Sequence, residues 1–222
     1  MLSTFNILIQ YREALLKGLF VTLELCIIIW VIGIVFGILL GYLASKFRDG
    51  IGLPIRVIFF ILGGIPILVL LFWFYYPAQT LLNVNIPPFW VTVFVLSILD
   101  IFYVAELVRS ALANFPNEYK LAAKVCGLSQ KDTFQRIEFP IIFRQIIPGL
   151  LNIQVNILQL TIFASLISVE EVFKVAQEIN SQIYEPVEIY STLAVFFLII
   201  CLPLNGLAMW LKYKFTRDIS ES

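Results

Sequence analysis

The longest uncharged stretch of this sequence runs from Val57 to Leu99, 43 residues without an Asp, Glu, Lys or Arg. As one helix it would measure about 65 Å at 1.5 Å per residue, roughly twice the hydrocarbon thickness of a bilayer. The stretch must therefore form two apolar segments. The break between them is marked by Pro77, Asn83, Asn85, Pro87 and Pro88. Pro66, which follows two glycines, predicts a bend within the first segment.

The remainder of the chain is similarly apolar. Of its 222 residues 60% are hydrophobic and 14% charged, whereas a soluble domain carries roughly a quarter charged residues. One small core cannot bury so much apolar surface, which predicts an all-α, polytopic membrane protein with a single domain over residues 1–222. We expect five transmembrane helices near residues 18–44, 55–76, 88–112, 143–168 and 189–211.

Three glycines recur at four-residue intervals in the first of these spans. Gly33, Gly37 and Gly41 therefore share one helical face. Small residues at this spacing let the backbone of another helix approach closely. Chance occurrence in an apolar segment is the alternative, and we favour helix packing.

The basic residues are distributed unevenly between the connections. An odd number of spans places the termini on opposite sides, and twelve of the fifteen Lys and Arg residues then fall on one side. They are Lys46, Arg48, Arg56, Arg109, Lys120, Lys124, Lys131, Arg136, Arg144, Lys212, Lys214 and Arg217. The positive-inside rule assigns that side to the cytoplasm. The N-terminus and the acidic segment 170–188 are then expected outside, and the C-terminus inside.

Several classes of site are disfavoured by composition. The chain has no histidine, and its three cysteines (Cys26, Cys126 and Cys201) lack metal-ligand spacing, so neither a metal site nor a disulfide framework is predicted. No G-x-x-x-x-G-K-[ST] motif occurs, so ATP is not expected to bind this chain. The formal net charge of +0 offers no support for a nucleic-acid partner.

A polar, basic segment, residues 117–140, separates two of the apolar spans. Asn117 is suited to cap a short helix that stops at Gly127, and Ser129 with Asp132 resembles the cap of a second helix. Two such helices with Ala122 and Ala123 exposed would fit a groove on another protein. An amphipathic loop lying on the lipid surface is the alternative.

This segment resembles the cytoplasmic EAA loop of ABC-importer permeases, in which E-A-A is followed after three residues by G and about a dozen residues later by proline. Ala122, Ala123, Gly127, Leu128 and Pro140 match, whereas Leu121 replaces the glutamate and Glu118 the usual glycine. Other matches follow in the family's order. They are Gly18, Thr22, Leu23, Gly33 and Gly37 of the first span, Pro66 to Val69, Tyr103 to Arg109 of the A-Y-x-A-E-x-x-R-G signature, and Thr161 with Ala164, Ser165 and Leu166. That signature is typical of the polar-amino-acid (histidine, glutamine, arginine, opine) subfamily.

The resemblance implies a type I, binding-protein-dependent importer in a bacterial inner membrane. It implies three partners: a cytoplasmic ABC ATPase dimer that holds ATP and Mg²⁺, a second permease subunit (identical or a sister chain), and an external solute-binding protein. The chain itself would be a permease for a polar amino acid or related solute, with no enzymatic activity and no cofactor. The residues expected at the ATPase contact are Glu118, Leu121, Ala122, Ala123, Gly127 and Leu128.

Polar residues inside the spans are costly unless paired or hydrated and are candidates for the solute path. Those we single out are Glu24, Asp100, Asn156, Gln159, Thr161 and Ser165, with Asn152 on the same helical face as Asn156 and Gln159. Hydrogen bonding between helices, and a headgroup-level position for Glu24, are the alternatives. Glu106 is expected to pair with Arg109 at i+3.

Two other functions compete with an ABC permease. An ion-coupled secondary transporter would use Glu24, Asp100 or Glu106 as proton sites, but such proteins commonly contain internal repeats, which this sequence does not show. A membrane-embedded enzyme is disfavoured because no histidine, metal cluster or nucleophile–base pair is evident.

Overall fold

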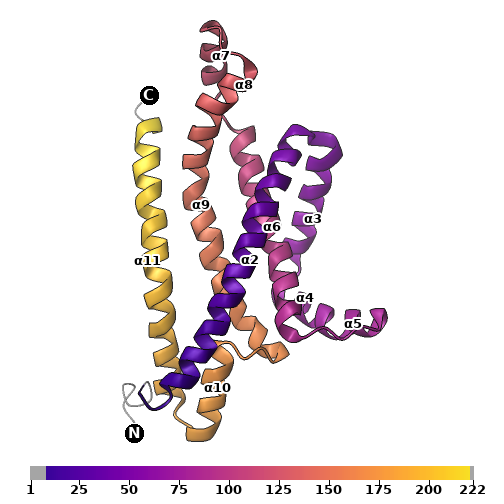
Figure 1. The fold of residues 1–222 in the computed structure, drawn as a ribbon, viewed down its shortest axis with the longest axis vertical. Helices are drawn as coiled ribbons and strands as arrows, with labels where there is room; N and C mark the ends of the chain where they lie inside the picture. Colours follow the sequence, from indigo (N-terminus) through magenta and orange to yellow (C-terminus); the bar gives the residue numbers. More distant parts are fainter. Residues whose placement is uncertain (1–8, 221–222) are drawn as a thin grey trace.

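The computed structural model describes residues 9–220, which form helices joined by short connections and contain no strand (Figure 1). Long helices run side by side along the long axis of the molecule. The short helices α7 and α8 and the end of α11 lie at one end, and α10 and the beginning of α2 lie at the other. The polar segment 117–140 and the acidic segment 170–188 are therefore at opposite ends of the bundle.

The centre of the fold is the contact between α2 (Arg12–Lys46) and α6 (Pro88–Ala113). The predicted glycine packing is confirmed: Gly33 lies against Asp100, Gly37 against Val104 and Gly41 against the backbone of Ala105. The residue numbers of the contacting pairs increase along both helices in the same direction, so α2 and α6 run parallel. The largest cluster of buried hydrophobic residues includes Leu25, Ile29, Leu71, Leu96, Leu99 and Ile157.

The second predicted span is broken rather than merely kinked. A π-helical turn, η1 (Arg48–Gly52), leads into α3 (Leu53–Gly64), and α4 (Ile67–Tyr75) follows after Pro66. The two halves are bent by 94°, and α4 and the short α5 (Pro77–Leu82) turn away from the bundle in Figure 1. The 12 residues of α3 cover only about 18 Å, so this helix alone cannot cross a bilayer.

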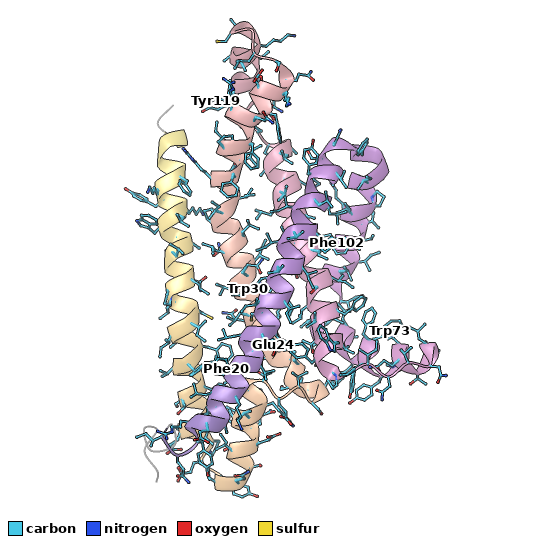
Figure 2. All side chains as sticks on the ribbon, viewed as in Figure 1. Phe20, Glu24, Trp30, Trp73, Phe102 and Tyr119 are labelled. Carbon is cyan, nitrogen blue, oxygen red and sulfur yellow. The ribbon has the colours of Figure 1, made fainter. Side chains whose placement is uncertain are left out.

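Four other segments of the described chain are long and apolar enough to cross a membrane, and the bent pair makes a fifth if it counts as one span. The second half of the chain supplies two of them. One is α9 (Phe139–Leu160), which continues into the 3₁₀ helix η3 (Thr161–Ile167), and the other is α11 (Pro186–Ser220). Phe20 projects from the bundle (Figure 2), and Phe60 and Ile199 are likewise exposed, as lipid contact requires.

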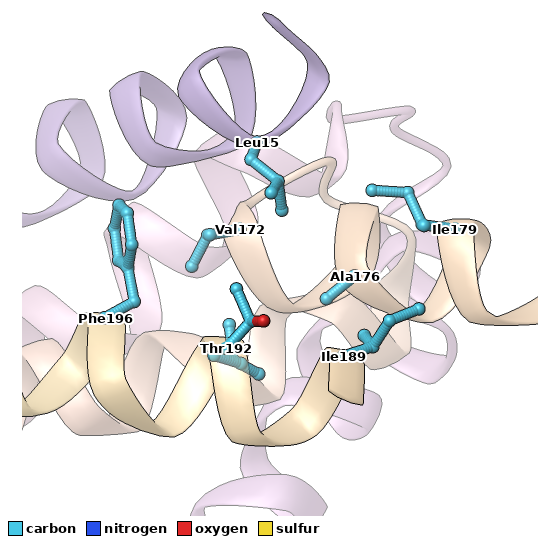
Figure 3. A pocket seen from close by; sticks show the side chains of 8 residues that line it. Leu15, Val172, Ala176, Ile179, Ile189, Thr192 and Phe196 are labelled. Atoms are coloured by element: carbon cyan, nitrogen blue, oxygen red, sulfur yellow. The ribbon is translucent and has the colours of Figure 1, made fainter. Parts of the chain in front are cut away.

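The acidic segment contains a helix that the sequence analysis did not predict, α10 (Val172–Ile183). Its apolar side, Val172, Ala176 and Ile179, packs with Leu15 of α2 and Ile189 of α11. The gap between these side chains, shown in Figure 3, is about 10 Å³ and is lined almost entirely by apolar groups. A space of that size holds at most one water molecule, so it is a packing defect and not a ligand site.

Candidate functional site

The polar segment between α6 and α9 folds into two short helices. The first, α7 (Asn117–Val125), ends at Gly127, whose φ of +72° is left-handed. The Leu128 N–H donates to the Ala123 carbonyl at 3.0 Å, which is a glycine-terminated helix end as predicted. The expected cap by Asn117 is wrong: Pro116 precedes the first turn and no side chain caps it. The fixed φ of proline orients the chain there instead.

The second helix joins α7 firmly to the membrane span. The predicted cap by Ser129 is confirmed, since its Oγ accepts a hydrogen bond from the Asp132 N–H at 3.1 Å. From there α8 (Gln130–Thr133) continues through a π turn, η2 (Phe134–Glu138), into α9 without a break. Lys120 of α7 lies 3.5 Å from Glu138. This ion pair connects α7 directly to the start of α9.

The outward surface of α7 differs from the predicted one. Ala123 is only 2% exposed, so the expectation that both alanines face outward is wrong for Ala123. Four of its exposed residues, Glu118, Leu121, Ala122 and Val125, share one helical face by their spacing. We call these four residues the α7 face. Leu121 is 63% and Val125 88% exposed.

The sequence analysis did not include Val125, because the EAA motif has no position for it. The helical period nevertheless places Val125 on the same face as Leu121. Ala123 instead packs beneath the α7 face, and its carbonyl receives the Leu128 N–H. Gly127 and Leu128 form the end of the helix. Ala123 therefore supports the α7 face from beneath, and Gly127 and Leu128 fix the end of the helix.

Asp100, which we expect on the solute path, is buried in this structure and faces no open path in the single chain. The residue is 0% exposed, and the backbone of Gly33 lies against its side chain. Gln154 of α9 donates from Nε2 to the Asp100 Oδ1 at 3.1 Å. No local pattern links these two residues, which are 54 positions apart in the chain, so sequence reasoning did not pair them.

Thr161 and Ser165 are buried as well, so neither lines an exposed path in this structure. The Thr161 Oγ1 donates to the Leu158 carbonyl at 2.7 Å, and the Ser165 Oγ donates to the Ile162 carbonyl at 2.7 Å. Both hydroxyls therefore satisfy backbone groups around the α-to-3₁₀ transition of this span. Such transitions often mark hinges.

Three polar side chains of α9 remain exposed in the single chain. They are Asn152, Asn156 and Gln159, which share one helical face by their spacing, and we call them the α9 polar face. Gln159 lies next to the Cys201 thiol, which places this face at the edge next to α11. Glu24 of α2 is exposed too (Figure 2). Amide groups facing lipid would be unfavourable, so this face requires water, solute or another subunit.

The predicted pair of Glu106 and Arg109 is confirmed. The Arg109 Nε donates to the Glu106 Oε2 at 2.7 Å, and the Arg109 Nη2 donates to the Glu106 Oε1 at 2.5 Å. This two-point contact neutralises both charges within α6. Glu106 is therefore occupied by its own helix and is not available to a solute.

A buried carboxyl group begins α10 at the opposite end of the molecule. Glu171 is 0% exposed and accepts hydrogen bonds from the Phe173 N–H at 2.9 Å and the Lys174 N–H at 2.7 Å. Burial raises its pKa to about 7, against the lowering effect of the two N–H donors. The next residue, Val172, donates its N–H to the Thr22 Oγ1 at 3.2 Å. The carboxyl thus caps α10 where the helix meets α2.

Comparison with known proteins agrees with this arrangement. Residues 33–220 match the family described as "Binding-protein-dependent transport system inner membrane component". This chain is a member of that family. Within the inner membrane component family it is 30% identical to the octopine transport system permease protein OccM of Rhizobium radiobacter, covering 86% of this chain and 81% of the relative. It is also 30% identical to the glutamine transport system permease protein GlnP of Escherichia coli (strain K12), covering 86% and 88%.

The fold of this inner membrane component is shared with solved transporters. The structure superposes on an amino acid ABC transporter crystallised with histidines with a TM-score of 0.83, at 24% identity over 93% of this chain and 96% of the other. It superposes on the MetNI methionine ABC transporter in an inward-facing conformation with a TM-score of 0.71, at 16% identity over 93% and 98%. The chain therefore has the type I ABC-importer permease fold and is the permease component of an importer.

Proposed function

We propose that this permease carries a polar amino acid or a related solute, received from an external solute-binding protein and driven by a cytoplasmic ABC ATPase dimer. It works as one of two permease subunits, either two copies of this chain or this chain and a sister. ATP and Mg²⁺ are held by the ATPase, and this chain binds no cofactor. The names of the octopine and glutamine relatives support this class of solute.

The α7 face is the observation that carries the proposal. The helix α7 lies beyond the end of the long helices in Figure 1. Its Leu121 and Val125 side chains are 63% and 88% exposed, so no other part of the described chain covers them. Apolar side chains in such a position are expected to dock in a groove on a partner protein. Glu118 at the edge of this face adds a charge that a basic rim on the ATPase would recognise.

Movement of α7 would be transmitted to the membrane span through rigid contacts. Two features connect α7 to α9. One is the Lys120–Glu138 ion pair, and the other is the uninterrupted helical path from α8 through η2 into α9. When the ATPase dimer closes, the displaced α7 shifts α9 and the α9 polar face together. The bend at Pro66 and the 3₁₀ segment η3 are the positions where the rest of the bundle adjusts.

The α9 polar face and Glu24 form the proposed solute path. Asn156 and Gln159 supply donors and acceptors suited to the carboxylate and ammonium of an amino acid, and Glu24 adds negative charge for the ammonium. The acidic outer end of the chain faces the binding protein. The end with α7 faces the cytoplasm, as the distribution of Lys and Arg indicates, and the membrane is the bacterial inner membrane.

Uptake by proteoliposomes tests the proposal. The permease, co-purified with its ATPase, is reconstituted and supplied with binding protein and labelled glutamine, histidine or octopine. We expect the labelled solute to accumulate only when ATP is present on the side of the membrane that carries the ATPase. Accumulation should stop when the ATPase is omitted. Accumulation driven by a proton gradient without any ATPase would instead support an ion-coupled secondary transporter and overturn the proposal.

A further inference from the structure

A polar junction lies where α2, α6 and α9 meet inside the bundle. Asp100 and Gln154 are 0% and 5% exposed and share one hydrogen bond, from the Gln154 Nε2 to the Asp100 Oδ1. Their other two oxygens, Asp100 Oδ2 and Gln154 Oε1, are buried and have no hydrogen-bond partner among the described residues. Both of these atoms are acceptors when the carboxyl group is ionised, so neither can satisfy the other.

Among the side chains that the structure describes, no cation is placed to balance an ionised Asp100. No charged residue occurs between Glu24 and Lys46 on α2, or between Arg144 and Glu170 along α9 and η3. On α6 itself, Arg109 is occupied by Glu106, and the nearest titratable group, Tyr103, packs its ring against Phe59. A buried carboxylate without a counterion is strongly disfavoured and normally takes up a proton.

We propose that Asp100 carries a proton and forms a cyclic acid–amide pair with Gln154. The Asp100 Oδ2–H donates to the Gln154 Oε1 while the Gln154 Nε2–H donates to the Asp100 Oδ1. A single proton taken from water thereby satisfies both acceptors that are otherwise unfilled and removes the charge. The two groups are planar and each carries its two polar atoms side by side, which is the shape that such a pair requires.

The pair has a positioning role in the permease. It joins α6 to α9 at the level where Gly33 brings α2 against α6, so it holds three helices in register. The α9 polar face lies on the exposed side of the same helix. Asp100 and Gln154 are therefore positioning residues for the solute path and do not touch the solute.

The test uses variants that distinguish a neutral pair from an ionised group. Asp100→Asn retains two complementary hydrogen bonds with Gln154, whereas Asp100→Ala retains none. In the full chain purified with its accompanying subunits in lipid nanodiscs, we expect Asp100→Asn to keep the thermal midpoint within about 2 °C of wild type. Asp100→Ala should lower it by at least about 5 °C.

Infrared spectroscopy supplies a readout that packing alone does not affect. At pH 7 the spectrum of the wild type minus that of Asp100→Asn should show the C=O band of a protonated carboxyl group. The band of the partly protonated Glu171 is common to both proteins and cancels in this difference. The exchanged double variant Asp100→Asn/Gln154→Glu moves the acid to α9 and should restore the band while keeping the thermal midpoint near that of wild type. Recovery of the band in the double variant depends on the acid–amide pair and not on the transported solute. Its failure would therefore leave the proposed function unaffected.

Two results would overturn the proposal. One is the absence of a protonated-carboxyl band from the difference spectrum between wild type and Asp100→Asn at pH 7. The other is a loss of thermal stability in Asp100→Asn as large as in Asp100→Ala. Together they would indicate an ionised Asp100 that is hydrated by water or balanced by a bound monovalent cation. The Ser97 hydroxyl, which lies one helical turn away and has no hydrogen-bond partner among the described residues, would then be a further ligand.

Discussion

Gly33 of α2 lies directly against the side chain of Asp100 on α6. An ideal Cβ added at Gly33 would be 2.6 Å from the Asp100 Cβ, closer than real carbon atoms approach. Asp100 in turn accepts a hydrogen bond from Gln154 of α9. The absence of one side chain on α2 therefore permits a polar contact between two other helices.

Gly33→Ala is expected to destabilise the permease because the new methyl group overlaps a side chain attached directly to the α6 backbone. Overpacking of this kind costs about 1–3 kcal/mol. The control is Gly206→Ala in α11, where an added Cβ meets nothing within 4 Å. In thermal unfolding in nanodiscs, Gly33→Ala should have a lower midpoint than wild type, and Gly206→Ala should not. Equal midpoints for the two variants would contradict the packing described here.

Leu121→Asp and Val125→Asp are each expected to reduce ATP-driven uptake about tenfold or more, because a charge replaces an apolar contact at the centre of the α7 face. The fold should be unaffected, since both side chains are exposed in the single chain. The matched control is Leu81→Asp, which is 77% exposed on α5, away from both the α7 face and the acidic segment. Uptake and thermal unfolding are measured on the same preparations. Normal uptake in both α7 variants would exclude this face as the ATPase contact.

Ala123→Asp should behave differently from those two variants. Ala123 lies beneath the α7 face, so a buried charge would displace the helix itself and lower the protein's stability by about 1–3 kcal/mol. Proteolysis of the 117–140 segment is the measurement, and we expect faster cleavage than in Leu121→Asp. Cleavage at the same rate in both would mean that Ala123 is not a packing residue.

Stability should decrease with rising pH because of Glu171. Its pKa is raised from 4.5 to about 7 by burial, so between these values the folded protein binds a proton that the unfolded chain has released. Protonation therefore stabilises the fold in that interval, and this contribution is lost as pH rises toward and through 7. Glu171→Gln should flatten the dependence of the thermal midpoint on pH between about 5 and 7.5. An unchanged slope in that variant would assign the effect to other groups.

Asn156→Leu is expected to raise the solute concentration needed for half-maximal uptake about fivefold to tenfold, the effect of losing roughly one solute hydrogen bond. Thermal stability should stay the same because Asn156 is exposed in the chain. The same substitution at Asn85, in the exposed connection before α6, is the control. A loss of subunit association without a change in uptake kinetics would indicate that the α9 polar face is an interface between subunits.

The features predicted from the sequence are those determined by short spacings. The glycines at four-residue intervals, the i+3 pair of Glu106 and Arg109, the cap at Ser129 and the left-handed Gly127 each depend on neighbours within about one turn of helix. Local rules describe such contacts well. The helix α10 also has a local signal, the apolar spacing of Val172, Ala176 and Ile179, which the surrounding glutamates obscured.

Other features depend on how distant segments meet. The burial of Ala123 follows from the way α7 packs against its surroundings, and the Asp100–Gln154 contact joins two helices whose relative rotation no single segment determines. The size of the bend at Pro66 is similar: proline predicts a break, but the 94° angle reflects packing of α4 against α6 and η3. These are tertiary effects that propensity and periodicity do not contain.

Cys126 allows the most direct test of the central claim, that α7 faces the cytoplasm and docks on an ATPase. It is the exposed cysteine next to the α7 face, whereas Cys26 and Cys201 are buried. A membrane-impermeant maleimide should label Cys126 in inside-out vesicles and not in intact spheroplasts, and bound ATPase should protect it. Labelling from the outer side, or equal labelling with and without the ATPase, would contradict the account.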